Sequence, residues 1–271
     1  MIRTTVVAAI AVGLLAGCSP SAPEQEAQAT THDPAAYASA INDIARPATD
    51  RERDATRKPG ELLAFAEIDA GDVVGDYIMG GGYVTRLLAI AVGSEGKVYA
   101  FQPDEFIQFR PEYATEQDEA VRPYADNDGN PTRVFPLRGP IAAPPFPEQL
   151  DTIITVMNFH DLYIGPMPAG TAENAIKALY DALKPGGSLI VIDHLAAEGS
   201  GAATADSLHR MDPDLALNML TAAGFVLEQE SDLYSRPADP RTANVFDPGI
   251  RGQTDQFMWR LRKPAAAQTA Q

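Results

Sequence analysis

Hydrophobic and polar positions along the central chain predict strands and helices in alternation. The run Val73–Ile78 is apolar enough for a buried strand, and Tyr83–Val92 after it has apolar residues at the spacing of one helix face. Further strands are expected at Lys97–Phe101, Arg133–Leu137, Asp151–Met157 and Ser188–Asp193. Further helices are expected over Asp104–Val121, Thr171–Leu183 and Asp212–Gly224. This order predicts an α/β fold with a mostly parallel sheet covered by helices on both faces.

The regions on either side of this alternation have different patterns. Strands are expected at Phe225–Glu230 and Gln256–Arg262, and the long irregular segment between them favours an antiparallel hairpin at one edge of the sheet. Before the first strand, Tyr37–Lys58 contains two short helical patterns broken at Pro47. In the second pattern, Asp50 is spaced to pair with arginine on a solvated helix face.

The first residues of the chain carry a different signal. Val6–Leu15 is apolar, follows the basic Arg3 and is too short to span a bilayer, which is typical of a secretory signal. Leu15-Ala16-Gly17-Cys18 resembles the bacterial lipoprotein box, in which the cysteine becomes the new N-terminus and carries a diacylglycerol. An ordinary signal peptide that contains a cysteine by chance is the alternative.

These patterns predict four regions. We expect a lipoprotein signal peptide in residues 1–17, a lipidated Cys18 with a disordered tether in 18–33, one domain in 34–263, and a disordered tail in 264–271. A lipid on Cys18 would place the domain on the periplasmic side of a bacterial membrane. Ser19 stands where an aspartate would signal retention in the inner membrane, so the outer membrane is favoured.

Charge and cysteine content narrow the classes of partner. The net charge is -16, from 37 acidic and 21 basic residues, and such a field repels phosphate backbones, so we expect no nucleic acid partner. Cys18 is the one cysteine in the sequence, which excludes an internal disulfide.

Ligands of open α/β sheets bind at the carboxyl ends of the strands, so the residues that follow each strand are candidates. Gly80, Gly81 and Gly82 follow the first strand and open a helix, where glycine permits close approach of a ligand to the backbone. Asn158, His160 and Asp161 follow the fourth strand. His160 is a candidate general base oriented by Asp161, and a loop histidine that caps the next element is the alternative.

Two more histidines are expected near the same edge of the sheet. His194 follows the fifth strand behind Asp193, and His209 lies in the next loop. Together with His160 and the aspartates they could bind a metal, but their spacing matches no compact metal motif, so we expect none.

Several of these segments carry a family resemblance. Four segments look like the successive motifs of class I S-adenosylmethionine-dependent methyltransferases: Asp76-x-x-x-Gly80-x-Gly82, Lys97–Ala100, Asp151–Ile154 and Leu183–Leu189. Four further segments resemble a narrower family, the exported lipoprotein-type predicted methyltransferases. They are RPATDRERDATRKP, NFHDLY, HRMDP and DPGIRGQTDQF. The resemblance implies a Rossmann-like methyltransferase fold and S-adenosylmethionine as cofactor. Asp76 and Gly80–Gly82 would hold its methionine part, Gln102 its ribose, and Asn158 would contact it.

The sequence departs from that family pattern at three positions. Ile78 replaces the first glycine of the turn, Gln102 replaces an acidic residue, and Pro140 follows Gly139 where an acidic residue near the adenine is usual. The leading hypothesis is a membrane-tethered methyltransferase that acts on a small molecule or an envelope component. The alternative is a non-enzymatic periplasmic binding or scaffold protein on a degenerate methyltransferase fold.

Overall fold

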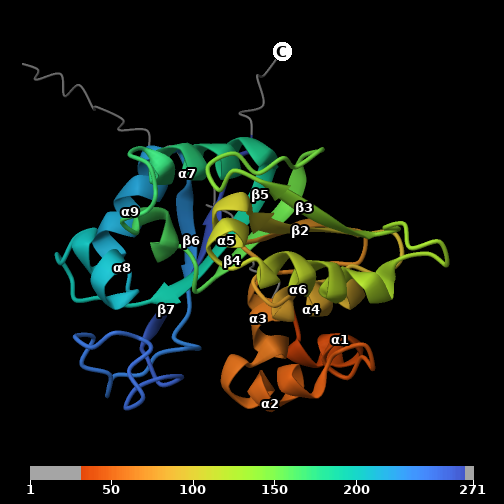
Figure 1. The fold of residues 1–271 in the computed structure, drawn as a ribbon, viewed down its shortest axis with the longest axis horizontal. Coiled ribbons are helices and arrows are strands. Elements are labelled where there is room, and N and C mark those ends of the chain that lie inside the picture. Colours follow the sequence, from red (N-terminus) through yellow and green to blue (C-terminus); the bar gives the residue numbers. More distant parts are fainter. Residues whose placement is uncertain (1–31, 266–271) are drawn as a thin grey trace, which may run out of the picture. The chain divides into compact units, whose positions relative to one another are not determined.

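The computed structural model describes residues 32–265, which form a seven-stranded sheet with helices on both faces (Figure 1). The strand order is β3-β2-β1-β4-β5-β7-β6. The strands are β1 (Val73–Tyr77), β2 (Lys97–Pro103), β3 (Val134–Gly139), β4 (Leu150–Val156), β5 (Leu183–His194), β6 (Val226–Glu230) and β7 (Gln256–Arg262). Among them, β7 pairs antiparallel with β5 and β6, and the other pairs are parallel. The structure confirms the predicted α/β sheet with its antiparallel edge.

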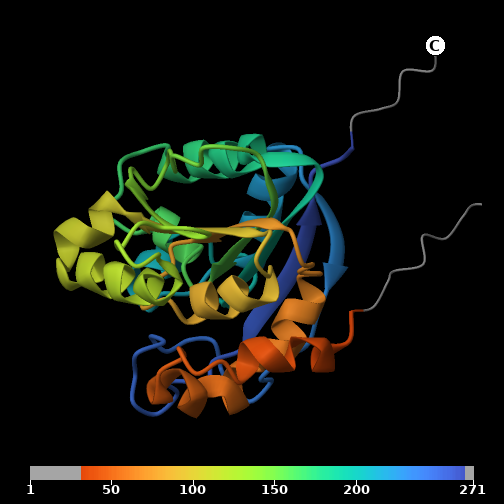
Figure 2. The same ribbon diagram turned by 90° about the vertical axis from the view of Figure 1, so that its right-hand side faces the viewer.

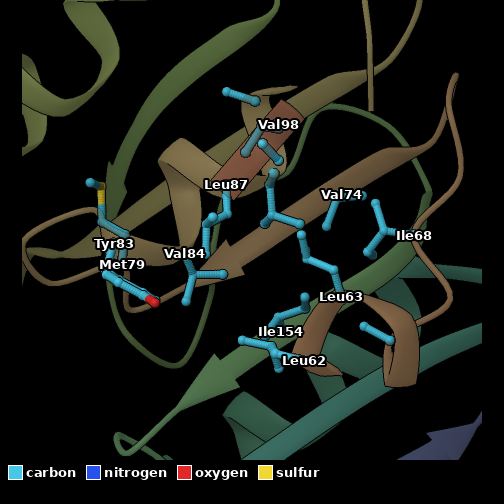
Figure 3. Close-up of a cluster of buried hydrophobic side chains, with 14 of the residues drawn as sticks. Leu62, Leu63, Ile68, Val74, Met79, Tyr83, Val84, Leu87, Val98 and Ile154 are labelled. Carbon is cyan, nitrogen blue, oxygen red and sulfur yellow. The ribbon is translucent and has the colours of Figure 1, made fainter. Parts of the chain in front are cut away.

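Alternate residues of the central strands pack on opposite faces of the sheet, because successive side chains of a strand point to opposite sides. Val74 of β1 and Ile154 of β4 join one buried cluster, and Ile153 joins the other. The first cluster lies under α1 (Ala38–Ile41), α3 (Pro59–Phe65), α4 (Tyr83–Ala91) and α6 (Glu112–Val121), and the second under α7 (Thr171–Ala182) and α9 (Pro213–Ala222). Figure 3 shows side chains of α3 and α4 meeting Val74 and Ile154.

Two segments far apart in sequence lie side by side at one end of the sheet (Figures 1 and 2). One contains α2 (Ala48–Arg57), and the other is the irregular segment 231–255 between β6 and β7. The hydroxyl of Tyr234 donates to the carbonyl of Arg57 at 2.6 Å, and Nζ of Lys58 donates to the carbonyl of Leu233 at 3.1 Å. Gln256 pairs with His194, so segment 231–255 lies at the carboxyl end of β5.

Several elements have other boundaries in the structure than those predicted from the sequence. The expected helix over 104–121 is two helices, α5 (Asp104–Phe109) and α6, because Arg110 precedes Pro111 and takes an extended conformation. The remaining short elements are η1 (Pro34–Tyr37), η2 (Arg122–Tyr124), η3 (His160–Tyr163) and α8 (Ala203–Leu208).

Two local interpretations of the sequence were wrong. The fifth strand begins at Leu183 rather than Ser188, because Gly186 and Gly187 exchange backbone hydrogen bonds with Lys263 and extend the sheet. Asp50 is not on a solvated face: its side chain is buried and bonds both Arg53 and Arg86.

The predicted signal peptide, Cys18 and most of the tether lie outside the described residues, as does the end of the predicted tail. Within residues 32–265, each helix is too short or too polar to span a lipid bilayer.

Candidate active site

The turn after β1 is held in an unusual backbone conformation. Ile78 ends the predicted strand one residue early, with φ of 63°, and Gly80 and Gly82 have φ of 54° and 79°. A β-branched residue is strained in the left-handed region, so surrounding contacts must hold Ile78 there. Nδ2 of Asn158, which follows β4, donates to the carbonyl of Ile78 at 2.8 Å.

The three glycines of the turn have different surroundings. A Cβ at Gly82 would lie 2.5 Å from Cβ of Ala120, so this glycine lets α4 and α6 approach each other. A Cβ at Gly81 would have its nearest contact at 3.9 Å, on a carboxylate oxygen of Glu116. A Cβ at Gly80 would meet nothing within 4 Å. Gly80 therefore borders open space at the carboxyl edge of the sheet.

Gln102, near the end of β2, faces the same turn. Its side chain is fully buried, and its Oε1 accepts a hydrogen bond from the backbone N–H of Gly80 at 3.1 Å. Its Nε2 is buried and has no hydrogen-bond partner among the described residues. A buried amide group without a partner is costly, so a polar ligand atom would be stabilising here.

Asp76 lies in β1 beneath the turn. It is 3% exposed, and its Oδ2 accepts a hydrogen bond from the hydroxyl of Thr85 at 2.5 Å. Burial raises the pKa of Asp76 to about 6, against the opposing effects of Thr85 and of Arg86. Removal from water therefore destabilises the charge of this carboxylate.

A half-buried carboxylate that the sequence analysis did not single out lies beside the departure at Pro140. Oε2 of Glu105, in the first turn of α5, accepts a hydrogen bond from the backbone N–H of Ile141 at 2.9 Å. Glu105 therefore places a carboxylate one residue beyond the position after Gly139. The signal available was an acidic first turn directly after the second strand.

His160 is buried in η3 and is bonded to Asp193 at the carboxyl end of β5. Its Nδ1 lies 2.8 Å from Oδ1 of Asp193, and its backbone N–H donates to Oδ2 of Asp193 at 2.6 Å. Nε2 of His160 lies 3.4 Å from Oδ1 of Asp161. The predicted pair of His160 and Asp161 is therefore in place, but the residue that orients the ring is Asp193.

The charges of this group are mutually dependent. Burial alone would lower the pKa of His160, but the carboxylates of Asp193 and Asp161 raise it to about 9. Burial raises the pKa of Asp161 to about 6, and the nearby His160 holds the pKa of the buried Asp193 below its usual range. At neutral pH His160 therefore keeps its proton in this arrangement. A general base must be neutral before it can accept a proton, so the catalytic role of His160 stays a prediction.

The other two predicted histidines lie close to His160. The ring centroids of His209 and His194 are 5.4 Å and 6.2 Å from that of His160. Nδ1 of His194 shares a hydrogen bond of 2.7 Å with the hydroxyl of Thr254. Burial lowers the pKa of His194 to about 4 and also lowers that of His209.

A separate polar cleft of about 480 Å³ lies between α2, α4 and α6. Asp50, Arg53 and Arg86 line this cleft. Of the residues predicted to bind the cofactor, Gly81 alone is among the lining residues. This cleft therefore borders the glycine turn at Gly81, and neither Asp76 nor Gln102 lines it.

The arrangement of strands and turn is that of the Rossmann-like methyltransferase fold. A SAM-dependent methyltransferase from Aquifex aeolicus is 19% identical over 85% of this chain and 98% of its own, with a TM-score of 0.52. The glycopeptide N-methyltransferase MtfA, solved with sinefungin, is 11% identical over 78% of this chain and 87% of its own, with a TM-score of 0.51. The [4+2]-cyclase SpnF is 20% identical over 81% of this chain and 82% of its own, with a TM-score of 0.54. At these identities the likeness concerns the fold alone.

No protein-family model matches the sequence, and no curated protein matches it.

Proposed function

We propose that this protein is an S-adenosylmethionine-dependent methyltransferase that is exported and tethered to a membrane. The observation that carries the proposal is the open space beside Gly80, whose backbone N–H donates to Oε1 of the buried Gln102. It lies after β1 and β2, where the sequence resemblance expects the cofactor. Proteins of this fold include S-adenosylmethionine-dependent enzymes.

The residues present fit the cofactor. Gly80 leaves room for a ligand against the backbone, and Asp76 supplies a carboxylate for the ammonium of the methionine part. Nε2 of Gln102 would donate to a ribose hydroxyl, and Glu105 places a second carboxylate beside Ile141, which follows β3. When bound, the cofactor would supply an electrophilic methyl group on its sulfonium.

The acceptor would lie on the side of His160 and Asp161. They follow β4, and Asn158, two residues before His160, contacts the glycine turn through Ile78. Methyl transfer requires the acceptor atom in line with the sulfonium, so the main contribution of these side chains would be to position the acceptor. We propose a small molecule or an envelope component as the acceptor class.

The membrane tether is proposed from the sequence alone. The apolar run Val6–Leu15 and the Leu15-Ala16-Gly17-Cys18 box support export and lipidation of Cys18. Ser19 favours the periplasmic side of the outer membrane.

Titration of the purified full chain with S-adenosylmethionine and S-adenosylhomocysteine tests the central claim. We expect saturable binding at roughly tens of micromolar, about 6 kcal/mol, because Gln102 replaces a carboxylate. Gly80→Ala should abolish it, because the added Cβ occupies the ligand space, whereas Asn218→Ala at an exposed position of α9 should preserve it. No binding at millimolar concentration by the folded protein would refute the proposal.

A second candidate function is a binding or scaffold protein without methyl transfer. Ile78, in a strained left-handed conformation where methyltransferases usually have glycine, favours this second candidate. Its side chain restricts the backbone conformations that the turn can adopt around a ligand. The [4+2]-cyclase among the structures of similar fold shows that the fold also serves another reaction. The same titration separates the two functions, because this candidate predicts no affinity for either ligand.

A further inference from the structure

We propose that His160, Asp161 and His209 form a binding site for one divalent transition-metal ion. One ligand atom from each of the three side chains lies within 4.8 Å of the others. His160 and Asp161 belong to η3 after β4, and His209 follows α8, so the fold gathers ligands that are 48 residues apart in sequence. The sequence spacing alone did not predict this group.

The hydrogen bond of His160 to Asp193 prepares one nitrogen of the ring for a metal. Nδ1 lies 2.8 Å from the buried carboxylate of Asp193, which also accepts from the backbone N–H of His160 and of His194. A carboxylate acceptor keeps the proton on Nδ1, so a metal ion would displace the other proton, from Nε2, and bind the lone pair released there. Metal-binding histidines in proteins are commonly oriented by such a carboxylate. Nε2 is the atom that faces Asp161, at 3.4 Å from its Oδ1.

His209 is the C-terminal cap of α8, and its ring lies against that of His160. Its φ is 53°, in the left-handed region, and its ring stands at 88° to the ring of His160. Phe246 packs against the ring of His209 at a centroid distance of 4.9 Å. Within residues 32–265, no group forms a hydrogen bond with the ring nitrogens of His209, so both remain available to a ligand.

The ligand set defines the class of ion. Two imidazoles and one carboxylate suit Zn²⁺, Co²⁺ or Fe²⁺ rather than Mg²⁺ or Ca²⁺, which prefer sets of oxygen ligands. Three protein ligands leave coordination positions open, as in catalytic rather than structural sites. On the proposed function, an open position would bind an oxygen, nitrogen or sulfur atom of the methyl acceptor and hold it near the glycine turn.

Titration of the metal-stripped full chain with Zn²⁺, and with Co²⁺ followed by its visible absorption, tests the site without any cofactor. We expect one equivalent to bind, and His209→Ala and Asp161→Asn each to weaken binding at least tenfold. His32→Ala is the matched control, because His32 is in the N-terminal part of the described chain and bonds Asp69. The metal affinity of the His32→Ala variant should equal that of the parent protein. These variants avoid His160→Ala, which would leave the buried Asp193 without its partner.

Absence of binding would overturn the metal site, as would equal affinity in His209→Ala or a loss in His32→Ala. Circular dichroism of each variant establishes that it is folded. Because neither S-adenosylmethionine nor methyl transfer enters this measurement, the metal site can fail while the methyltransferase proposal stands, and the reverse also holds.

Discussion

The side chain of Asn158 holds the backbone of Ile78 by a hydrogen bond of 2.8 Å from its Nδ2 to the Ile78 carbonyl. The same Nδ2 donates to the carbonyl of Val156 at 2.9 Å, so Asn158 connects the ends of β4 and β1. Ile78 is 2% exposed, and its side chain packs in the core on the second face of the sheet. The packing and the hydrogen bond together maintain its left-handed conformation against a strain of roughly 1–2 kcal/mol.

Substitution of Asn158 should therefore weaken ligand binding at the glycine turn. Asn158→Ala removes the donor, and we expect about a tenfold loss of S-adenosylhomocysteine affinity, near 1.4 kcal/mol. Asn158→Asp should lose more, because its charge would face two carbonyl oxygens. Calorimetric titration measures both, with the exposed Asn218→Ala on α9 as control. Equal affinity in all three variants would contradict this role.

Gln102 offers a gain-of-binding test. Gln102→Glu restores the acidic residue of the usual methyltransferase pattern and still accepts from the N–H of Gly80. A carboxylate binds hydroxyl groups more strongly than an amide oxygen, so affinity for S-adenosylhomocysteine should rise severalfold. The thermal midpoint of the ligand-free protein should fall, because the side chain is fully buried. Unchanged affinity would mean that Gln102 does not contact the ribose.

The sequence predicted the sheet better than it predicted the site. Gln256–Arg262 was predicted with the bounds of β7, because strand pattern and burial coincide there. Ile78 was assigned to the first strand because its side chain is apolar, but backbone conformation at the strand end depends on Asn158, 80 residues away. Local pattern cannot reveal such a partner.

The same limitation applied to the histidine site. The sequence placed His160 after the fourth strand correctly and paired it with its neighbour Asp161, yet Asp193 forms the closer contact. Asp193 lies at the end of the adjacent strand β5, so the register of β4 and β5 brings the two side chains together. His209 joins them only because α8 packs beside η3, which no spacing in the sequence indicates.

Binding of S-adenosylhomocysteine should depend on pH through Asp76. Burial raises the pKa of this carboxyl from 3.8 to about 6 in the folded protein. The ligand ammonium favours the ionised form, so affinity should rise as pH increases through about 6 and level off above it. Titrations between pH 5 and 8 test this, with Asp76→Asn expected to remove the rise. A rise that persists in Asp76→Asn would assign the effect to another group.

The raised pKa of Asp76 also affects folding stability, with the opposite dependence on pH. The folded state holds this proton up to about pH 6, whereas the unfolded state releases it near pH 3.8. The contribution of Asp76 to stability therefore decreases as pH rises from about 4 to about 6 and is constant above that range. Comparison of Asp76→Asn with the parent by chemical denaturation across this range isolates the contribution.

The proposed lipid anchor is tested in cells. Cys18→Ser removes the sulfur that would carry the diacylglycerol, so labelling with a radioactive fatty acid should be lost and the signal should remain uncleaved. The parent protein should be labelled and should partition with membranes. A parent that takes up no lipid and shows the same distribution as Cys18→Ser would refute lipidation.

Gly82 should tolerate substitution far less well than Gly81, although the two are neighbours. A Cβ at Gly82 would lie 2.5 Å from Cβ of Ala120, an atom fixed to the backbone of α6, and its φ of 79° is strained for any residue with a side chain. Overpacking and left-handed strain each cost roughly 1–3 kcal/mol, so Gly82→Ala should lower the free energy of unfolding by about 2 kcal/mol or more. At Gly81 the nearest contact is 3.9 Å away and φ is not positive, so Gly81→Ala should change it by about 0.5 kcal/mol or less. Urea denaturation of both variants measures the difference. Equal free energies of unfolding would show that α6 leaves room for a side chain at Gly82.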